Sequence, residues 1–236
     1  MTNNKNDSLE EKLNGFLTKK AKIISICLCV AVAAALALAF LISSSNKSTE
    51  KDLAFIQNIE ANLKMTEEKP ADTSDEKTAE ENKAEEVKSF SADEALSQLE
   101  PYTAKSGVTG VRANMLAAEI HYAKKSFDKA AESWVKAAEA DKSPYTAPLC
   151  YFNAASAYES IETPDTQKAC ENYSKAAEYE EFEMIDRALF NAGRTNEQLG
   201  KTEEAKAFYE KLAEKDNAAS WANLAKSRLI ALEINK

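Results

Sequence analysis

The chain has 236 residues, a length that accommodates one or two domains. It contains only five glycines and five prolines, while 29% of its residues are charged and alanine, lysine and glutamate recur throughout. This composition is poor in turn and strand formers and rich in helix formers, so it indicates an all-α protein. The net charge is −9, and the acidic chain carries no basic patch of the kind that nucleic-acid binding needs. Nucleic acid is therefore excluded as a partner.

An uncharged apolar run of twenty residues extends over positions 23–42. A helix of this length spans roughly 30 Å, the hydrocarbon thickness of a bilayer. Three lysines precede it directly, and residues 1–22 carry five lysines against three acids. Because positive flanks stay in the cytoplasm, the run predicts one transmembrane helix, a cytoplasmic N-terminal tail and an exported C-terminal part, which the resemblance given below would place in the inner (cytoplasmic) membrane and the periplasm.

A cleaved signal peptide is the alternative for the same run. The tripeptides Ala35-Leu36-Ala37 and Ala37-Leu38-Ala39 have the small-x-small pattern of a cleavage site. The apolar run is longer than the roughly 7–15 residues of a usual signal core, and the polar region before it is long. An uncleaved signal anchor is therefore the preferred interpretation.

An acidic segment follows, and residues 43–90 are predicted to form a disordered tether. They carry seven lysines against twelve acids, and between residues 66 and 88 the only large aliphatic residue is Val87. Such a segment cannot bury enough apolar surface to offset the entropy lost on ordering. A short amphipathic helix over residues 51–64 is the one exception considered, because four apolar residues would share a face: Leu53, Ile56, Ile59 and Leu63.

Three similar blocks then recur, over Met115–Ala140, Phe152–Glu178 and Phe190–Glu214. In each block a small residue lies in the first predicted helix and a large aromatic residue lies four positions into the second. A small residue lets two helix axes approach closely, and an aromatic ring fills the space beside it. The small residues are Ala118, Ala155 and Gly193, the alanines that open the second helices are Ala130, Ala169 and Ala205, and the aromatic residues are Trp134, Tyr173 and Tyr209.

The blocks resemble the tetratricopeptide repeat family over residues 110–216. Their alanine-to-alanine spacings are 39 and 36 residues, against about 34 in the ideal repeat. The chain departs from the family pattern at His121 and Asn196, where the family favours tyrosine, and in the proline after each unit, with Pro144 late and Asn217 in its place. The resemblance implies a tetratricopeptide-type α-solenoid of helical hairpins over residues 91–236.

Two flanking helices complete this predicted domain, one as the remnant second helix of a preceding unit and one as a C-terminal cap. Helices are predicted near 91–104, 109–124, 127–140, 144–160, 165–180, 184–199, 202–214 and 218–234.

A protein-binding groove is predicted along the first helix of each pair, which lines the concave side of such a solenoid. Met115, Phe152 and Phe190 would align across adjacent repeats, flanked by arginines, and aromatic, Met and Arg side chains are enriched in protein interfaces. The alternative is that the apolar residues pack between repeats and the charges are ordinary surface. The predicted stripe consists of Arg112, Met115, Glu119 and Tyr122, then Leu149, Phe152, Ser156 and Glu159, then Arg187, Phe190, Arg194 and Glu197.

Catalytic and metal chemistry are not expected. No Gly-rich phosphate loop, G-x-S-x-G elbow or HExxH motif is present. The single histidine, His121, is predicted to be a packing residue, and Cys150 and Cys170 are predicted to be small buried residues. No cofactor or zinc site follows from four cysteines and one histidine at these spacings. An enzyme that uses a pair of acids is the contrasting hypothesis.

The plan of tail, anchor, tether and exported repeats resembles bacterial inner-membrane tetratricopeptide proteins, including the ancillary subunit of the Sec translocon. This resemblance implies a membrane-tethered scaffold or chaperone-like adaptor for exported or envelope proteins. Its expected partners are other proteins or peptides, and the membrane through residues 23–42. The alternative is an oligomerising envelope-assembly or cell-division adaptor, and a purely structural role is also considered. The lysine-and-asparagine carboxylate clamp of chaperone-binding relatives is not reproduced.

Overall fold

A computed structural model describes residues 15, 35, 45–65, 90–215 and 219–234. Within these ranges the regular structure is helical and contains no strand. The chain divides into two units, residues 1–51 and 52–236. No helix in the described ranges is both long and apolar enough to cross a membrane. Apart from Ala35, the predicted transmembrane segment 23–42 lies outside the described residues.

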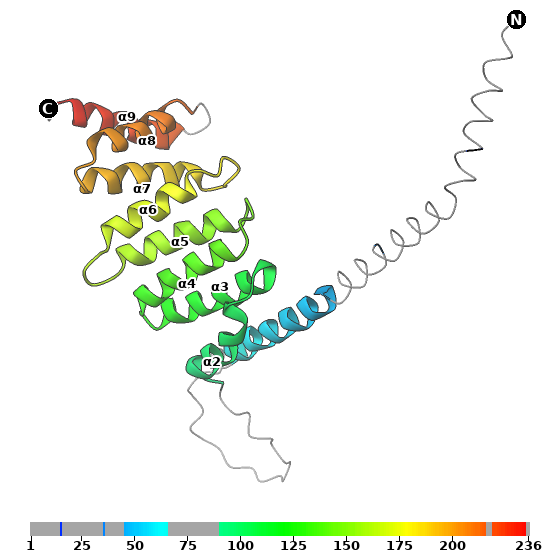
Figure 1. Ribbon diagram of the computed structural model, residues 1–236. Coiled ribbons are helices and arrows are strands. Elements are labelled where there is room, and N and C mark those ends of the chain that lie inside the picture. Colours follow the sequence, from blue (N-terminus) through cyan, green and yellow to red (C-terminus); the bar gives the residue numbers. More distant parts are fainter. Residues whose placement is uncertain (1–14, 16–34, 36–44, 66–89, 216–218, 235–236) are drawn as a thin grey trace, which may run out of the picture. The chain divides into compact units, whose positions relative to one another are not determined.

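Three helical pairs correspond to the three sequence blocks, and each helix packs mainly on its neighbours in chain order (Figure 1). Every predicted helix range overlaps an observed helix, with ends that differ by at most four residues. The all-α prediction is therefore confirmed for the described residues. The pairs are α3 (Gly107–Ala123) with α4 (Phe127–Ala140), α5 (Ala147–Glu159) with α6 (Thr166–Ala176), and α7 (Ile185–Gln198) with α8 (Thr202–Ala213); α2 (Ala92–Thr103) precedes them and α9 (Ala219–Ile234) follows.

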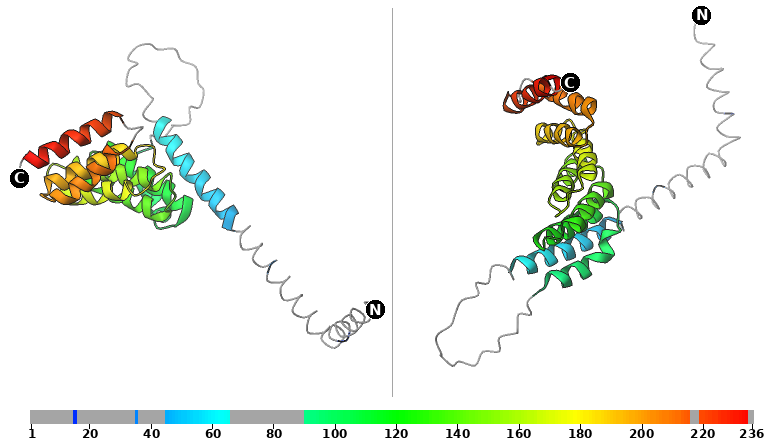
Figure 2. Two further views of the ribbon diagram at one scale, coloured as in Figure 1. Left: turned by 90° about the horizontal axis from the view of Figure 1, so that it is seen from above. Right: turned by 90° about the vertical axis from the view of Figure 1, so that its left-hand side faces the viewer.

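A further helix occupies residues 45–65, and residues 52–65 of it belong to the unit that contains the repeats. Its Ile56 and Ile59 are 1% and 2% exposed and form a core cluster with Leu99 of α2 and Leu116 of α3. The right-hand view of Figure 2 shows residues 52–65 of this helix beside α2 and α3. It supplies the first helix of a pair whose second helix is α2.

The expected disordered tether is thus wrong for residues 45–65, whereas the amphipathic helix considered over 51–64 is confirmed. The apolar stripe of this segment is too short to stabilise a helix alone, but it gains a partner face on α2 and α3. Residues 66–89, the rest of the predicted tether, lie outside the described part of the chain.

Small residues and aromatic rings set the packing within each pair, as predicted. Ala118 and Ala155 are fully buried, and the aromatic residue of each second helix is buried as well. The closest approach is at Gly193, where an added Cβ would lie 2.6 Å from Cε1 and 2.8 Å from Cδ1 of Tyr209. This position of α7 therefore has no room for a methyl group while the Tyr209 ring keeps its place.

We predict that Gly193→Ala lowers the free energy of unfolding by about 1–3 kcal/mol, because the methyl group overpacks the contact with Tyr209. The cost should shrink when Tyr209→Leu removes the ring, which urea unfolding of the two single variants and the double variant measures. An equal cost with and without the ring would contradict this account.

Candidate protein-interaction surface

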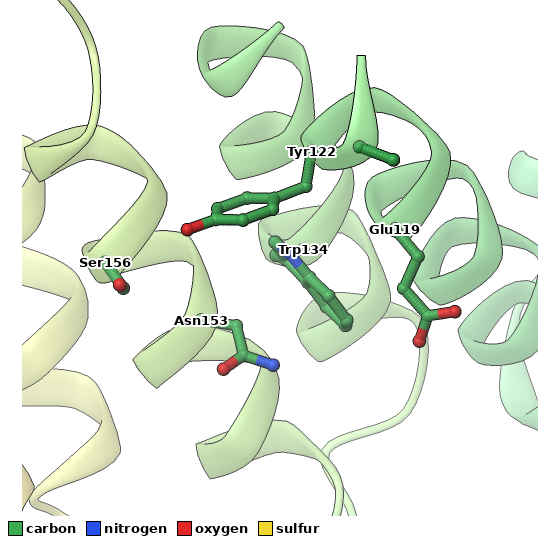
Figure 3. A pocket seen from close by; sticks show the side chains of 6 residues that line it. Glu119, Tyr122, Trp134, Asn153 and Ser156 are labelled. Atoms are coloured by element: carbon green, nitrogen blue, oxygen red, sulfur yellow. The ribbon is translucent and has the colours of Figure 1, made fainter. Parts of the chain in front are cut away.

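The predicted stripe contributes to two cavities in the described residues. The first, the α3–α5 cavity, has a volume of about 340 Å³ and includes three stripe residues (Figure 3). The second, the α7–α9 cavity, has a volume of about 400 Å³ and also includes three. The α3–α5 cavity is lined by Glu119, Tyr122, Ala123, Trp134, Asn153 and Ser156, and the α7–α9 cavity by Phe190, Arg194, Glu197, Gln198, Tyr209 and Arg228.

The two cavities occupy equivalent places in their repeats. Each uses the residues one, four and five positions after the small residue of the first helix, which is Ala118 in α3 and Gly193 in α7. Each also uses the aromatic residue of the paired second helix, Trp134 or Tyr209. The repeat geometry therefore generates a recess between one first helix and the next.

Arginine–carboxylate bridges cross three of the steps between successive first helices, counting helix 45–65 as the first and α9 as the last. Arg194 of α7 donates to both oxygens of Glu159 on α5, at 2.8 Å each. Arg228 of α9 pairs with Glu197 of α7. Between helix 45–65 and α3, Arg112 pairs with Glu60 at 3.0 Å. These bridges tie consecutive units together through side chains.

Two tyrosine hydroxyls complete the bridges from the second helices. Tyr173 donates to Glu159 at 2.9 Å, and Tyr209 donates to Glu197 at 3.1 Å. Burial, together with the neighbouring carboxylate, raises the pKa of Tyr173 well above its usual range and that of Tyr209 to about 12. Each hydroxyl therefore remains a donor to its carboxylate through the neutral range.

One central residue of the predicted stripe, Phe152, is buried in the structure and not exposed as predicted. Phe152 is only 7% exposed and packs edge-to-face on Tyr173, with 5.2 Å between ring centroids. Met115 and Phe190 are half-buried, and only Phe190 lines a cavity. The predicted line of three exposed apolar residues is therefore wrong, because at this register the side chain points toward its own second helix. Phe152 instead packs in the core, against Tyr173 of its own pair and Phe182.

The other stripe residues divide between the surface and local contacts. Arg187 is exposed and lies over the Phe152 ring, 5.3 Å from its centroid. Leu149 is half-buried against the main core. Tyr122 is 43% exposed and packs edge-to-face on Phe127. The stripe is therefore a mixed surface with two recesses, and whether it binds a partner stays a prediction.

The prediction of the binding stripe did not include residues of the second helices. Trp134 and Tyr209 were identified only as packing residues, yet both also line cavities. Asn153, Gln198 and Arg228 were not singled out, although Asn153 and Gln198 lie within one turn of stripe residues on the same helices. Helical spacing could have located those two, whereas the reach of Arg228 from α9 depends on how α9 docks.

The thiols and the imidazole of the described residues lie outside the two stripe cavities. Cys150 and Cys170 are free and buried, as predicted for small packing residues, and burial raises the pKa of the Cys150 thiol to about 12. His121 is half-buried, and partial burial followed by the charges of Lys129 and Lys124 lowers its pKa, which keeps the imidazole neutral. Neither thiol nor imidazole lines the two cavities.

A third cavity, of about 480 Å³, lies at the ends of α4 and α6, apart from the stripe. Lysines and glutamates alternate around it, and Lys175 lies over the Tyr151 ring at 5.1 Å from the centroid. Its charges are mixed, so it shows no preference for a ligand of one sign. It is lined by Glu139, Lys142, Tyr151, Lys175, Glu178 and Tyr179.

We predict that Glu159→Gln lowers the free energy of unfolding by about 1 kcal/mol, because Arg194 and Tyr173 both lose a charged acceptor in a partly buried place. Glu210→Gln, at an exposed residue of α8 outside both cavities, should change it by less than about 0.5 kcal/mol. Urea unfolding with Arg194→Gln and the double variant should show coupling, and strictly additive effects would contradict the bridge.

We predict that stability falls at high pH partly through Tyr209. Its pKa rises from 10 when exposed to about 12 in the fold, so the unfolded chain loses this proton first. The stabilisation is complete below pH 10 and is lost between pH 10 and 12, by about 1.4 kcal/mol per pH unit. Urea unfolding at pH 9 and 11 should show a shallower decline for Tyr209→Phe. Tyr145→Phe, at a 74% exposed residue, should decline as the unaltered chain does.

Comparison with known proteins agrees with the repeat geometry. The sequence model of the tetratricopeptide repeat matches residues 186–217, which include α8 and nearly all of α7. A TPR repeat-containing protein of Treponema pallidum (strain Nichols) is 37% identical over 130 residues, or 55% of this chain and 54% of that protein. The chain thus spans about half the length of this relative. Neither comparison indicates a catalytic family, and both support tetratricopeptide repeats, a protein-interaction architecture, in this chain.

Proposed function

We propose that this protein is a membrane-tethered adaptor that binds polypeptide segments of exported or envelope proteins, near the Sec translocon. The observation that carries the proposal is the pair of equivalent recesses on the first-helix side, at the α3–α5 and α7–α9 steps. Recesses that repeat along a solenoid suit an extended or helical segment that contacts several repeats at once.

The apolar run 23–42 supports the tether in this proposal. Only residues 43 and 44 separate it from the helix over 45–65, whose second half packs with the repeats. The anchor then holds the binding unit close to the bilayer, which raises its effective concentration near membrane complexes. The proposal thus needs no long flexible spacer at this point of the chain.

A second candidate is an adaptor that oligomerises through its C-terminal helix. Leu224, Ile230 and Ile234 of α9 are 48%, 59% and 77% exposed, although a helix that caps a solenoid usually presents a polar outer face. This observation favours a second copy of the chain as the partner of α9.

Photo-crosslinking of the full-length protein in its native membrane tests both candidates. We predict that p-benzoylphenylalanine at Tyr122, beside the α3–α5 cavity, crosslinks to an exported protein or a translocon subunit that mass spectrometry identifies. The same group at Glu210 should not. Deleting residues 23–42 should abolish these crosslinks, because the chain is then neither exported nor held at the membrane. Equal crosslinking at Tyr122 and Glu210 would contradict the proposal, and homomeric products from Ile230 alone would favour the oligomeric adaptor.

A further inference from the structure

The α3–α5 step is built differently from the other steps between first helices in the described residues. Each of the other three carries an arginine–carboxylate bridge, formed by Glu60 with Arg112, Glu159 with Arg194, and Glu197 with Arg228. By repeat position, Tyr122 replaces the acceptor glutamate of the later steps, Trp134 replaces the donor tyrosine, and Ser156 replaces Arg194.

The recess at this step therefore contains no bridge among the described residues, whereas the α7–α9 cavity is lined by both partners of one, Glu197 and Arg228. The α3–α5 cavity of about 340 Å³ contains all three of the replacing residues. In Figure 3 the Tyr122 ring extends from α3 toward Ser156 on α5, and the Trp134 ring lies with Asn153 on one side and Glu119 on the other. Rings of tyrosine and tryptophan are the surfaces on which a guanidinium stacks most favourably.

A carboxylate without a counterion lies at the same cavity. Glu119 forms no ion pair with any residue that the structure describes, because Glu60 holds both nearby cations, Lys64 at 2.7 Å and Arg112 at 3.0 Å. Partial burial and the charge of Glu60 raise the pKa of Glu119. A cation brought into the cavity would give this carboxylate an ion-pair partner.

We propose that the α3–α5 cavity binds an arginine side chain of the partner polypeptide, which supplies in trans the cation that Arg194 and Arg228 supply in the later steps. Its guanidinium stacks on Trp134 and Tyr122 and pairs with Glu119. Arginine fits better than lysine because its planar guanidinium stacks on aromatic rings. This inference rests on the proposed function and defines the chemistry of the bound segment.

Fluorine NMR of the full-length chain in detergent tests the proposal. The sequence has two tryptophans, so 5-fluorotryptophan labelling gives one probe at Trp134 and an internal control at Trp221, which packs on Phe190. The ligands are N-acetyl-arginine amide and its uncharged isostere, N-acetyl-citrulline amide. Arginine amide should shift the Trp134 resonance at concentrations that leave Trp221 unchanged, and citrulline amide should bind roughly tenfold more weakly.

Two variants test separately the charge of Glu119 and the space inside the cavity. Glu119→Gln should weaken binding of arginine amide roughly tenfold, whereas Glu210→Gln should not change it. Ser156→Arg places an arginine at the position of Arg194 and should occupy the cavity from within, which abolishes the arginine-dependent shift of Trp134. Thermal unfolding of each variant establishes that it is folded.

Equal binding of the two amides, or arginine binding unaffected by both Glu119→Gln and Ser156→Arg, would overturn the inference. That result would leave the adaptor function standing if Tyr122 still crosslinks to an identified partner. Loss of the crosslinks with a preserved arginine-specific shift would instead overturn the adaptor and leave an arginine site.

Discussion

The contact between a small residue on one helix and an aromatic ring on the next is the constraint on which the rest of this fold depends. At Gly193 the Tyr209 ring occupies the space that a Cβ would need, and Ala118 and Ala155 are buried at the equivalent positions. This contact fixes how close the two helices of a pair lie. It also places the residue one turn later, Tyr122, Glu159 or Glu197, beside the outer end of the ring. The chemistry of each recess therefore follows from a packing contact.

That placement explains why the bridges recur. A glutamate one turn after the small residue meets the tyrosine hydroxyl of its own pair, as Glu159 meets Tyr173 and Glu197 meets Tyr209. The same carboxylate faces the next first helix, from which Arg194 or Arg228 reaches it. Each carboxylate is thus satisfied from two helices, which stabilises the stacking of one pair on the next. Where tyrosine replaces the glutamate, at Tyr122, no such bridge forms among the described residues.

The sequence predicted the helices and their small-residue contacts well because both depend on local spacing. Ala118, Ala155 and Gly193 were located by periodicity alone, and their burial or close approach is confirmed. The binding stripe was predicted less well, since a side chain at a stripe position can point into its own helical pair instead of the groove, as Phe152 does. The role of Arg228 depends on how α9 docks, and the role of residues 45–65 depends on a partner face far along the chain. Such long-range contacts leave no local signature.

Helix 45–65 therefore changes the interpretation of the candidate site. Its Glu60 forms ion pairs with Lys64 and Arg112, and its charge raises the pKa of Glu119, which forms no ion pair with a described residue. Three of the four arginines in the chain form bridges and the fourth, Arg187, lies over Phe152. No arginine of this chain remains to fill the α3–α5 step. The segment that composition assigned to a spacer thus contributes Glu60, whose charge acts on Glu119 at the α3–α5 recess.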